Sequence, residues 1–298
     1  MDRTNSMNCN TESGICEVLP VKNDPSLRKP LKLVYFTDPI CSSCWGIEGQ
    51  LRKLKSEYGA YFDIEYRMGG LLPSWDAYNG SDVGKPTDVA SHWDEAGAHY
   101  DMPVNGDVWL EDPLSSSYPP SIAFKAAQVQ DEHKALLFLR RIKEMVFVEK
   151  RNITKWEHLE KAALEAGLDA AQLKKDFEGE GMKRFENDLA LAAEAGVRGF
   201  PTIYFTDDEG NRLKVYGSKP YEVYEKTLLN LFPTAVKQKP KADLQQLFSE
   251  YPGITAKEYA MIAGIVIEAA TVYLDRSVNE GHLLAVPAKN GSLYKPGK

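Results

Sequence analysis

The stretch that decides the fold is LVYFTDPICSSCWG, residues 33–46. The apolar run from Leu31 to Phe36 is rich in branched and aromatic side chains, which predicts a buried strand. The chain then turns at Asp38-Pro39 and places Cys41 and Cys44 three residues apart. Apolar residues recur behind them at helical spacing, at Ile47, Leu51, Leu54 and Tyr58. The stretch therefore predicts a strand, a turn, a Cys-x-x-Cys pair and a helix.

The position of the two cysteines gives them chemical meaning. A helix N-terminus leaves backbone N–H groups unpaired and carries partial positive charge. A thiolate there is stabilised, so its pKa falls and it becomes a better nucleophile. A lone Cys-x-x-Cys also looks like half of a zinc site, but the sequence holds no second such pair. We therefore favour a redox pair, and we predict no metal.

Composition excludes several classes of protein. The chain has 298 residues, 43% of them hydrophobic, which is enough for one large domain or two smaller ones. Its net charge of −7 shows no basic excess that would favour nucleic acid. The sequence contains no run of about 18 apolar residues, so it predicts no membrane span. The segment from Met1 to Asp24 lacks the basic-then-apolar pattern of a secretory signal, so we expect a cytoplasmic protein.

Residues 1–29 are polar and lack periodicity, which predicts a flexible tail. The tail holds the other two cysteines, Cys9 and Cys16. Three interpretations of these cysteines stay open: two exposed thiols, a disulfide that exchanges with Cys41 and Cys44, or half of a metal site.

The rest of the chain predicts an α/β protein. A second strand at 61–68 completes a β-α-β unit, and helical patterns fill 87–100 and 119–196. Strands at 202–205 and 213–216, joined by a turn, precede a final helix at 220–231. The order β-α-β, helices, β-β-α resembles a thioredoxin fold interrupted by a helical domain. We predict the thioredoxin-fold domain at 30–75 and 197–231, and the helical insertion at 76–196.

A lysine- and proline-containing linker, 232–241, leads to a small module at 242–298. Two short helices and a hairpin in this module resemble a winged helix. Its charges balance, with six Lys or Arg against six Asp or Glu from residue 241 onward. A DNA-reading domain is expected to carry a basic face. We therefore expect a docking or oligomerising role, with the module contacting a protein partner.

Four separated motifs resemble the DsbA family of thiol–disulfide oxidoreductases, in particular its branch of cytoplasmic predicted protein-disulfide isomerases. They are Asp38–Gly46, Met68–Leu71, Phe147–Thr154 and Gly196–Thr202. The chain is also similar to the YjbH/SpxH adaptors of the ClpXP protease and, more distantly, to FrnE-type oxidoreductases. The resemblance covers about residues 31–231.

The resemblance implies a role for each matching residue. Cys41 would be the exposed nucleophile, Cys44 the resolving thiol, and the redox-active disulfide between them would be the only cofactor. Pro201 would be a cis-proline facing that disulfide. The residues expected to contact substrate are Ser42, Ser43, Trp45, Phe200 and Pro201.

Two departures from the family leave the strength of the nucleophile open. Many members carry Pro, His or an aromatic residue between the cysteines, where this chain has Ser42-Ser43, whose hydroxyl and N–H groups could donate to a Cys41 thiolate. Asp38, three residues before Cys41, either raises the pKa of that thiol by its charge or serves only as a turn residue before Pro39.

Our main hypothesis from sequence is a thiol–disulfide oxidoreductase or isomerase acting on protein or glutathione disulfides by thiol exchange. The alternative is a protein-binding adaptor of the YjbH/SpxH type with little turnover. A glutathione-dependent isomerase is disfavoured, because those enzymes generally replace this cysteine pair with a serine-centred site. A zinc site that combines all four cysteines would require the tail to fold onto the pair.

Overall fold

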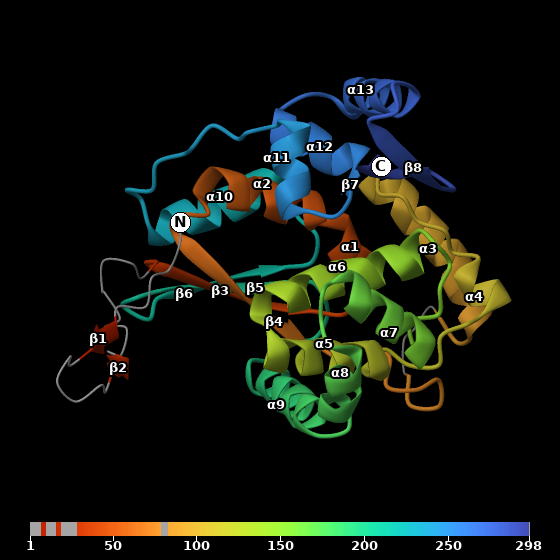
Figure 1. Cartoon of the computed structure of the whole chain (residues 1–298), viewed down its shortest axis with the longest axis horizontal. Helices are drawn as coiled ribbons and strands as arrows, with labels where there is room; N and C mark the ends of the chain where they lie inside the picture. The colour runs from red at the N-terminus through yellow and green to blue at the C-terminus, as the bar shows by residue number, and fades with distance from the viewer. Residues whose placement is uncertain (1–6, 10–15, 19–28, 79–82, 298) are drawn as a thin grey trace.

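The computed structural model describes residues 7–9, 16–18, 29–78 and 83–297. A four-stranded sheet with the order β4-β3-β5-β6 lies at its centre (Figure 1). β3 (Leu31–Thr37) pairs in parallel with β4 (Phe62–Met68) and antiparallel with β5 (Thr202–Asp207), which pairs antiparallel with β6 (Arg212–Tyr216). The predicted thioredoxin fold is therefore confirmed.

One face of the sheet is covered by α2 (Glu48–Tyr58) and α10 (Tyr221–Leu231). Alternate residues of β3 point into this layer and are almost fully buried, as expected for a period-two strand. The single helix predicted behind the cysteines is two helices, because the backbone leaves helical geometry at Ile47. The first of them, α1 (Ser42–Gly46), has only five residues.

A helical layer follows β4 and forms the largest hydrophobic cluster among the described residues. The predicted helices at 87–100 and within 119–196 are present, and one short helix, α4, was not predicted. The elements are α3 (Pro86–Tyr100), α4 (Val108–Glu111), α5 (Tyr118–Gln130), α6 (Glu132–Phe147), α7 (Trp156–Glu165), α8 (Ala170–Phe177) and α9 (Glu180–Glu194).

The C-terminal module has the predicted two helices and hairpin, with an additional helix and a short strand before them. Its strands form a separate sheet of order β7-β9-β8. The elements are α11 (Leu244–Glu250), β7 (Ile254–Thr255), α12 (Ala256–Ala263), α13 (Ile267–Asn279), β8 (Leu283–Ala288) and β9 (Gly291–Pro296).

In the N-terminal tail, β1 (Met7–Cys9) and β2 (Cys16–Val18) pair antiparallel, with Cys9 opposite Cys16 in the register. The sequence pattern did not predict this pair of strands. Tail residues 1–6, 10–15 and 19–28, and the side chains on which the three interpretations of Cys9 and Cys16 depend, lie outside the described part of the chain.

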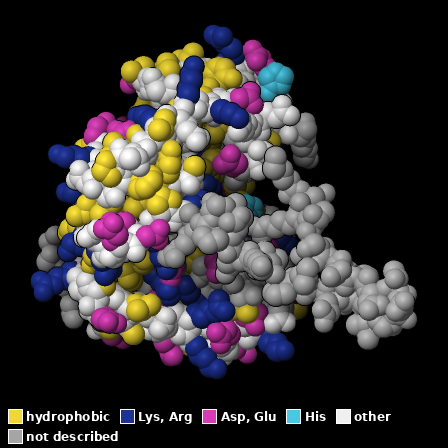
Figure 2. Space-filling model, turned by 90° about the vertical axis from the view of Figure 1, so that its left-hand side faces the viewer, with side chains coloured by type: hydrophobic (Ala, Val, Ile, Leu, Met, Phe, Trp, Pro, Cys, Tyr) yellow, Lys and Arg dark blue, Asp and Glu magenta, His cyan; other side chains and the backbone are white. Residues whose placement is uncertain are grey.

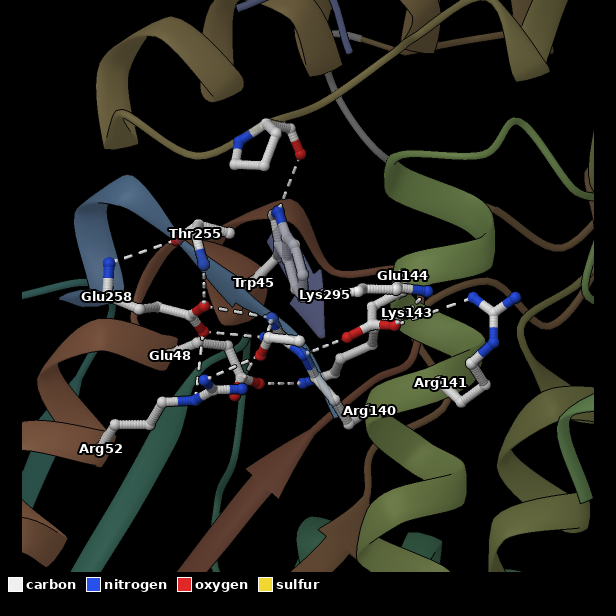
Figure 3. A network of polar contacts seen from close by, with 12 residues as sticks. Trp45, Glu48, Arg52, Arg140, Arg141, Lys143, Glu144, Thr255, Glu258 and Lys295 are labelled. Atoms are coloured by element: carbon white, nitrogen blue, oxygen red, sulfur yellow. Dashed lines mark hydrogen bonds and ion pairs between the residues drawn. The ribbon is translucent and has the colours of Figure 1, made fainter. Parts of the chain in front are cut away.

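Buried ion pairs join the C-terminal module to the rest of the protein (Figure 3). Both oxygens of Glu258, on α12, accept hydrogen bonds from the guanidinium group of Arg140, on α6, at 2.8 and 3.1 Å. Arg52, on α2, lies 3.2 Å from the same carboxylate. The Glu258 side chain is fully buried, and the other two are almost so. Glu258 therefore connects helix α12 of the C-terminal module to α2 beside the central sheet and to α6 of the helical layer.

Close backbone packing supports the same contact. A Cβ atom on Gly49 of α2 would lie 2.8 Å from Met261 Sδ of α12, so glycine lets the two helices approach. Glu258 also forms a capping box at the start of α12, where its carboxylate accepts from the Thr255 N–H group at 2.8 Å. The capping box therefore fixes the Glu258 carboxylate relative to the N-terminus of α12.

The left-hand side of the molecule carries a mixed surface (Figure 2). Hydrophobic side chains gather there in a band, and basic and acidic side chains are interspersed around it. Elements at this side include β6 and α10, whose Tyr216 and Val223 are exposed. Among the described residues, no helix is long and apolar enough to cross a membrane.

We predict that Glu258→Ala lowers the free energy of unfolding by about 3–5 kcal/mol, because it leaves Arg52 buried without an ion-pair partner and removes one of the carboxylates that pair with Arg140. Urea unfolding of the full chain measures the change. Glu280→Ala, which removes an exposed carboxylate after α13, is the matched control and changes stability by no more than about 0.5 kcal/mol. Equal effects of the two substitutions would contradict the role of Glu258.

Candidate functional site

The cysteine pair lies where the sequence placed it, at the start of α1. Cys41 is the N-cap residue, and its Sγ accepts a hydrogen bond from the Cys44 N–H group at 3.2 Å. Both residues are free thiols. Cys41 is only 5% exposed and Cys44 is fully buried. A large substrate therefore reaches little of the Cys41 sulfur, in contrast to the expected exposed nucleophile.

Burial also changes the acidity of the two thiols. It raises the pKa of Cys41, and the hydrogen bond and charge of Cys44 raise it further. Burial alone would raise the pKa of Cys44 as well, but the Cys41 thiol and the Lys143 cation more than offset this and lower it. The expectation that the helix N-terminus makes Cys41 the acidic thiol is not supported. A helix of five residues has a small dipole, and desolvation outweighs it.

The Asp38 carboxylate ties three segments together beneath the pair. One oxygen accepts from the Ile40 N–H group at 3.0 Å, and the other accepts from the Leu71 N–H group and the Ser117 hydroxyl, both at 2.8 Å. Burial raises the pKa of Asp38 to about 6. Its negative charge also raises the pKa of Cys41. Both roles considered for Asp38 are therefore present.

Phe200 and Pro201 come directly before β5. The peptide bond between them is cis, as the family resemblance implied. The Phe200 ring covers Gly69 so closely that a Cβ atom there would lie 2.0 Å from it, which explains the glycine after β4. Pro201 is buried at the start of β5, and its carbonyl accepts from the Gly217 N–H group at 2.8 Å.

A mostly apolar pocket of about 200 Å³ opens beside Cys41. It brings together four predicted site residues, Cys41, Ser42, Ser43 and Phe200. The residues that the sequence analysis did not assign to a site are Ile40, Leu71, Leu72, Trp75, Tyr78, Val83, Val89, His92, Trp93 and Trp109. The high density of aromatic residues between 75 and 109 is the signal that could have found them. We call this cavity the aromatic pocket.

Trp45 does not line the aromatic pocket. Its side chain is fully buried and stacks on Phe147, with ring centroids 5.4 Å apart. Its indole N–H group donates to the Pro103 carbonyl at 3.1 Å, and the Arg140 guanidinium lies 4.4 Å from its ring (Figure 3). The prediction that Trp45 contacts substrate is wrong, because the tryptophan forms part of the core that joins α1 to the helical layer.

The Ser43 hydroxyl is also engaged by the helical layer. It lies 3.0 Å from the Tyr100 hydroxyl of α3, and the Tyr100 ring covers Gly46, where a Cβ atom would lie 2.4 Å from it. No hydrogen bond from a serine hydroxyl to Cys41 is present among the described residues. Within the same part of the chain, no three His, Cys, Asp or Glu side chains are arranged to hold a metal ion.

Comparison with known proteins gives two kinds of match. The thioredoxin family matches residues 35–226. The "ClpXP adapter protein SpxH" of Halalkalibacterium halodurans is 35% identical over 98% of this chain and 97% of its own length. The protein of the same name from Bacillus subtilis is 31% identical over 90% of each chain.

A solved structure shares the fold. The "cytosolic disulfide reductase DsbM" of Pseudomonas aeruginosa superposes with a TM-score of 0.54 and 24% identity, over 67% of this chain and 99% of that one. This likeness supports the DsbA-like thioredoxin fold and nothing about activity. The full-length relatives carry the name of an adapter. Our main hypothesis of a thiol–disulfide oxidoreductase or isomerase is therefore wrong, and the adaptor alternative is the better one.

We predict that Asp38 makes stability depend on pH. The pKa of Asp38 is about 6 in the folded protein and near 3.8 in an exposed carboxyl, so folding favours the neutral carboxyl. The stabilisation that comes from this neutral form is complete below about pH 4 and is lost as pH rises through 6. The size of this effect is about 3 kcal/mol. Asp38→Asn cannot ionise, so the stability of wild type relative to this variant should fall between pH 4 and 7. Urea unfolding across this range measures the difference, and a constant difference would contradict the prediction.

We also predict slow alkylation of Cys41. In a Cys44→Ala chain at pH 7, iodoacetamide should modify Cys41 at least about tenfold more slowly than Cys9 or Cys16 in a peptide of residues 1–29, because the thiolate is the reactive form. Peptide mass spectrometry gives each rate. Equal rates would show that burial does not suppress this thiol.

Proposed function

The chain belongs to the thioredoxin family and to its group of ClpXP adapter proteins SpxH, and on this premise we propose that it binds a client protein and delivers it to the ClpXP protease. The aromatic pocket beside the nearly buried Cys41 carries the proposal. The site offers apolar surface for binding and little access to sulfur, which is the arrangement that an adapter needs.

We propose that the client inserts one large apolar side chain into the aromatic pocket. Its volume of about 200 Å³ is below the range of roughly 300–1,000 Å³ that is usual for small-molecule sites, so one side chain fills it. Aromatic walls supply much apolar contact area, and Ser42 and His92 add polar groups at the lining. An apolar anchor in such a pocket is typical of the dominant contact in a protein interface.

The proposal keeps Cys41 and Cys44 as a pair that can close a disulfide, without a catalytic role and without a further cofactor. It places the protein in the cytoplasm, where a thiol pair is normally kept reduced. Client proteins replace the disulfide and glutathione substrates expected from the sequence. Through Glu258, the C-terminal module contacts Arg140 of the helical layer. We propose that the remaining surface of the module binds a protein partner.

We predict that the chain accelerates degradation of its client by purified ClpXP and ATP by at least about tenfold, because bound client is delivered to the protease; about tenfold is the effect of 1.4 kcal/mol on a binding constant and serves here as a threshold. Clients are first identified by crosslinking in the cells of origin and then purified. The double variant Cys41→Ser, Cys44→Ser should retain the acceleration.

Phe200→Ala should lose most of the acceleration, because it removes one wall of the aromatic pocket. Leu164→Ala is the control, since Leu164 is an exposed apolar side chain on α7 outside that pocket. Unchanged degradation with and without the chain, for every crosslinked protein, would contradict the adapter function. Loss of the effect in the double cysteine variant would show that the thiols are required.

A further inference from the structure

We infer that the tip of the β8–β9 hairpin positions one wall of the aromatic pocket, so that Lys289 and Asn290 act as positioning residues for client binding. The effect on client binding rests on the proposed function, whereas the positioning of the pocket wall does not. The two residues lie in the turn between β8 and β9, in the C-terminal module, and touch the helical layer rather than the pocket.

Lys289 joins the two helices that carry two of the three pocket tryptophans, Trp93 and Trp109. Its Nζ lies 2.6 Å from Asp94 Oδ2 on α3 and 2.6 Å from Asp107 Oδ1, the N-cap residue of α4. The other oxygen of Asp94 accepts from the Gly106 N–H group at 2.8 Å. Because each of these two carboxylate oxygens lies 2.6 Å from Nζ, they are no more than about 5.2 Å from each other. Without the lysine cation between them, the two carboxylates would repel each other, and this repulsion would separate α3 from α4.

The affected helices set the spacing of two pocket rings. Trp93 precedes Asp94, and Trp109 lies two residues after Asp107. Their ring centroids are 5.2 Å apart in an edge-to-face arrangement, and both rings line the pocket. This geometry is favourable only within a narrow range of distances. A change in the separation of α3 and α4 therefore changes the shape of the pocket.

Asn290 fixes the segment between these helices. Its Oδ1 accepts from the Val104 N–H group at 2.9 Å, and its Nδ2 donates to the Met102 carbonyl at 2.7 Å. The side chain also lies against Gly97 of α3, where a Cβ atom would be 3.1 Å from Oδ1. The oxygen and the nitrogen of the Asn290 amide therefore both bind the backbone of the same short segment, residues 102–104.

The residue between these two contacts reaches the cysteine helix. The Pro103 carbonyl accepts from the Trp45 indole, and Trp45 follows Cys44 directly. The segment 102–104 is therefore held on one side by the hairpin tip and on the other by α1. The hairpin is itself fixed, because Lys295 of β9 pairs with Glu144 and Glu149 at 3.2 and 3.4 Å. The tip can position α3 and α4 against a rigid support.

Four variants of the full chain, each in the Cys44→Ala background, test this inference. Lys289→Glu places a third carboxylate beside Asp94 and Asp107, whereas Lys289→Arg keeps a cation that can bridge both. Asn290→Ala removes the two backbone hydrogen bonds without adding charge. Arg276→Glu makes the same charge change at an exposed position of α13 and is the matched control.

The first readout needs no client. Cys41 lines the aromatic pocket, so its alkylation rate with iodoacetamide reports how far the wall has opened. We expect Lys289→Glu and Asn290→Ala to raise this rate at least about fivefold, the lower end of ordinary coupling between sites. Lys289→Arg and Arg276→Glu should leave it unchanged. Urea midpoints measured beside the rates show that all variants are folded.

The second readout is the affinity for a crosslinked client, which should fall by a similar factor in the same two variants. Rates and affinities of Lys289→Glu and Asn290→Ala equal to those of Arg276→Glu would overturn the inference. If no client binds the wild-type chain, the proposed function fails, while the alkylation rates still decide whether the hairpin tip positions the pocket wall. The two failures are therefore distinguishable.

Discussion

The buried contact between Glu258 and two arginines is the constraint on which the structure depends. Arg52 comes from the thioredoxin-fold part, Arg140 from the helical layer and Glu258 from the C-terminal module. Because all three charges are removed from water, each depends on its charged partners, which for Arg140 also include Glu144 at 2.9 Å. The contact is adjacent to the site, since the Arg140 guanidinium also lies on the ring of Trp45, next to Cys44. The cysteine helix and the C-terminal module are therefore parts of one rigid frame.

Within that frame the thioredoxin fold is kept, while the features that favour thiol exchange are weakened. Cys41 still caps a helix and the peptide bond before Pro201 is still cis, but burial raises the pKa of Cys41 and limits access to its sulfur. Lys143, which lowers the pKa of Cys44, is itself paired with Glu48 at 2.8 Å. The space that remains beside the pair is lined by aromatic rings. The thioredoxin fold thus has an apolar cavity beside a nearly buried cysteine pair, and the full-length relatives that it resembles carry adapter names.

Local sequence signals predicted the parts of the structure that local physics determines. The apolar run from Leu31 to Phe36 placed β3, and the cysteine spacing behind it placed Cys41 and Cys44 at the start of α1. The cis bond before Pro201 was implied by the family resemblance. The role of Trp45 was missed because its neighbours in the core, Phe147 and Pro103, are about 60 to 100 residues away in the chain. The buried charges were missed for the same reason. In the sequence, Glu258 is one more charged residue on a helix, and only its partners show that it is buried.

The central claim is that the client occupies the aromatic pocket beside buried thiols. Hydrogen–deuterium exchange of the chain alone and with its client tests this most directly, because bound backbone exchanges more slowly. The account predicts new protection at 71–75, 89–93 and 199–202, with unchanged exchange at α12 and α13. Protection confined to other segments, with none around Phe200 and Trp93, would contradict it.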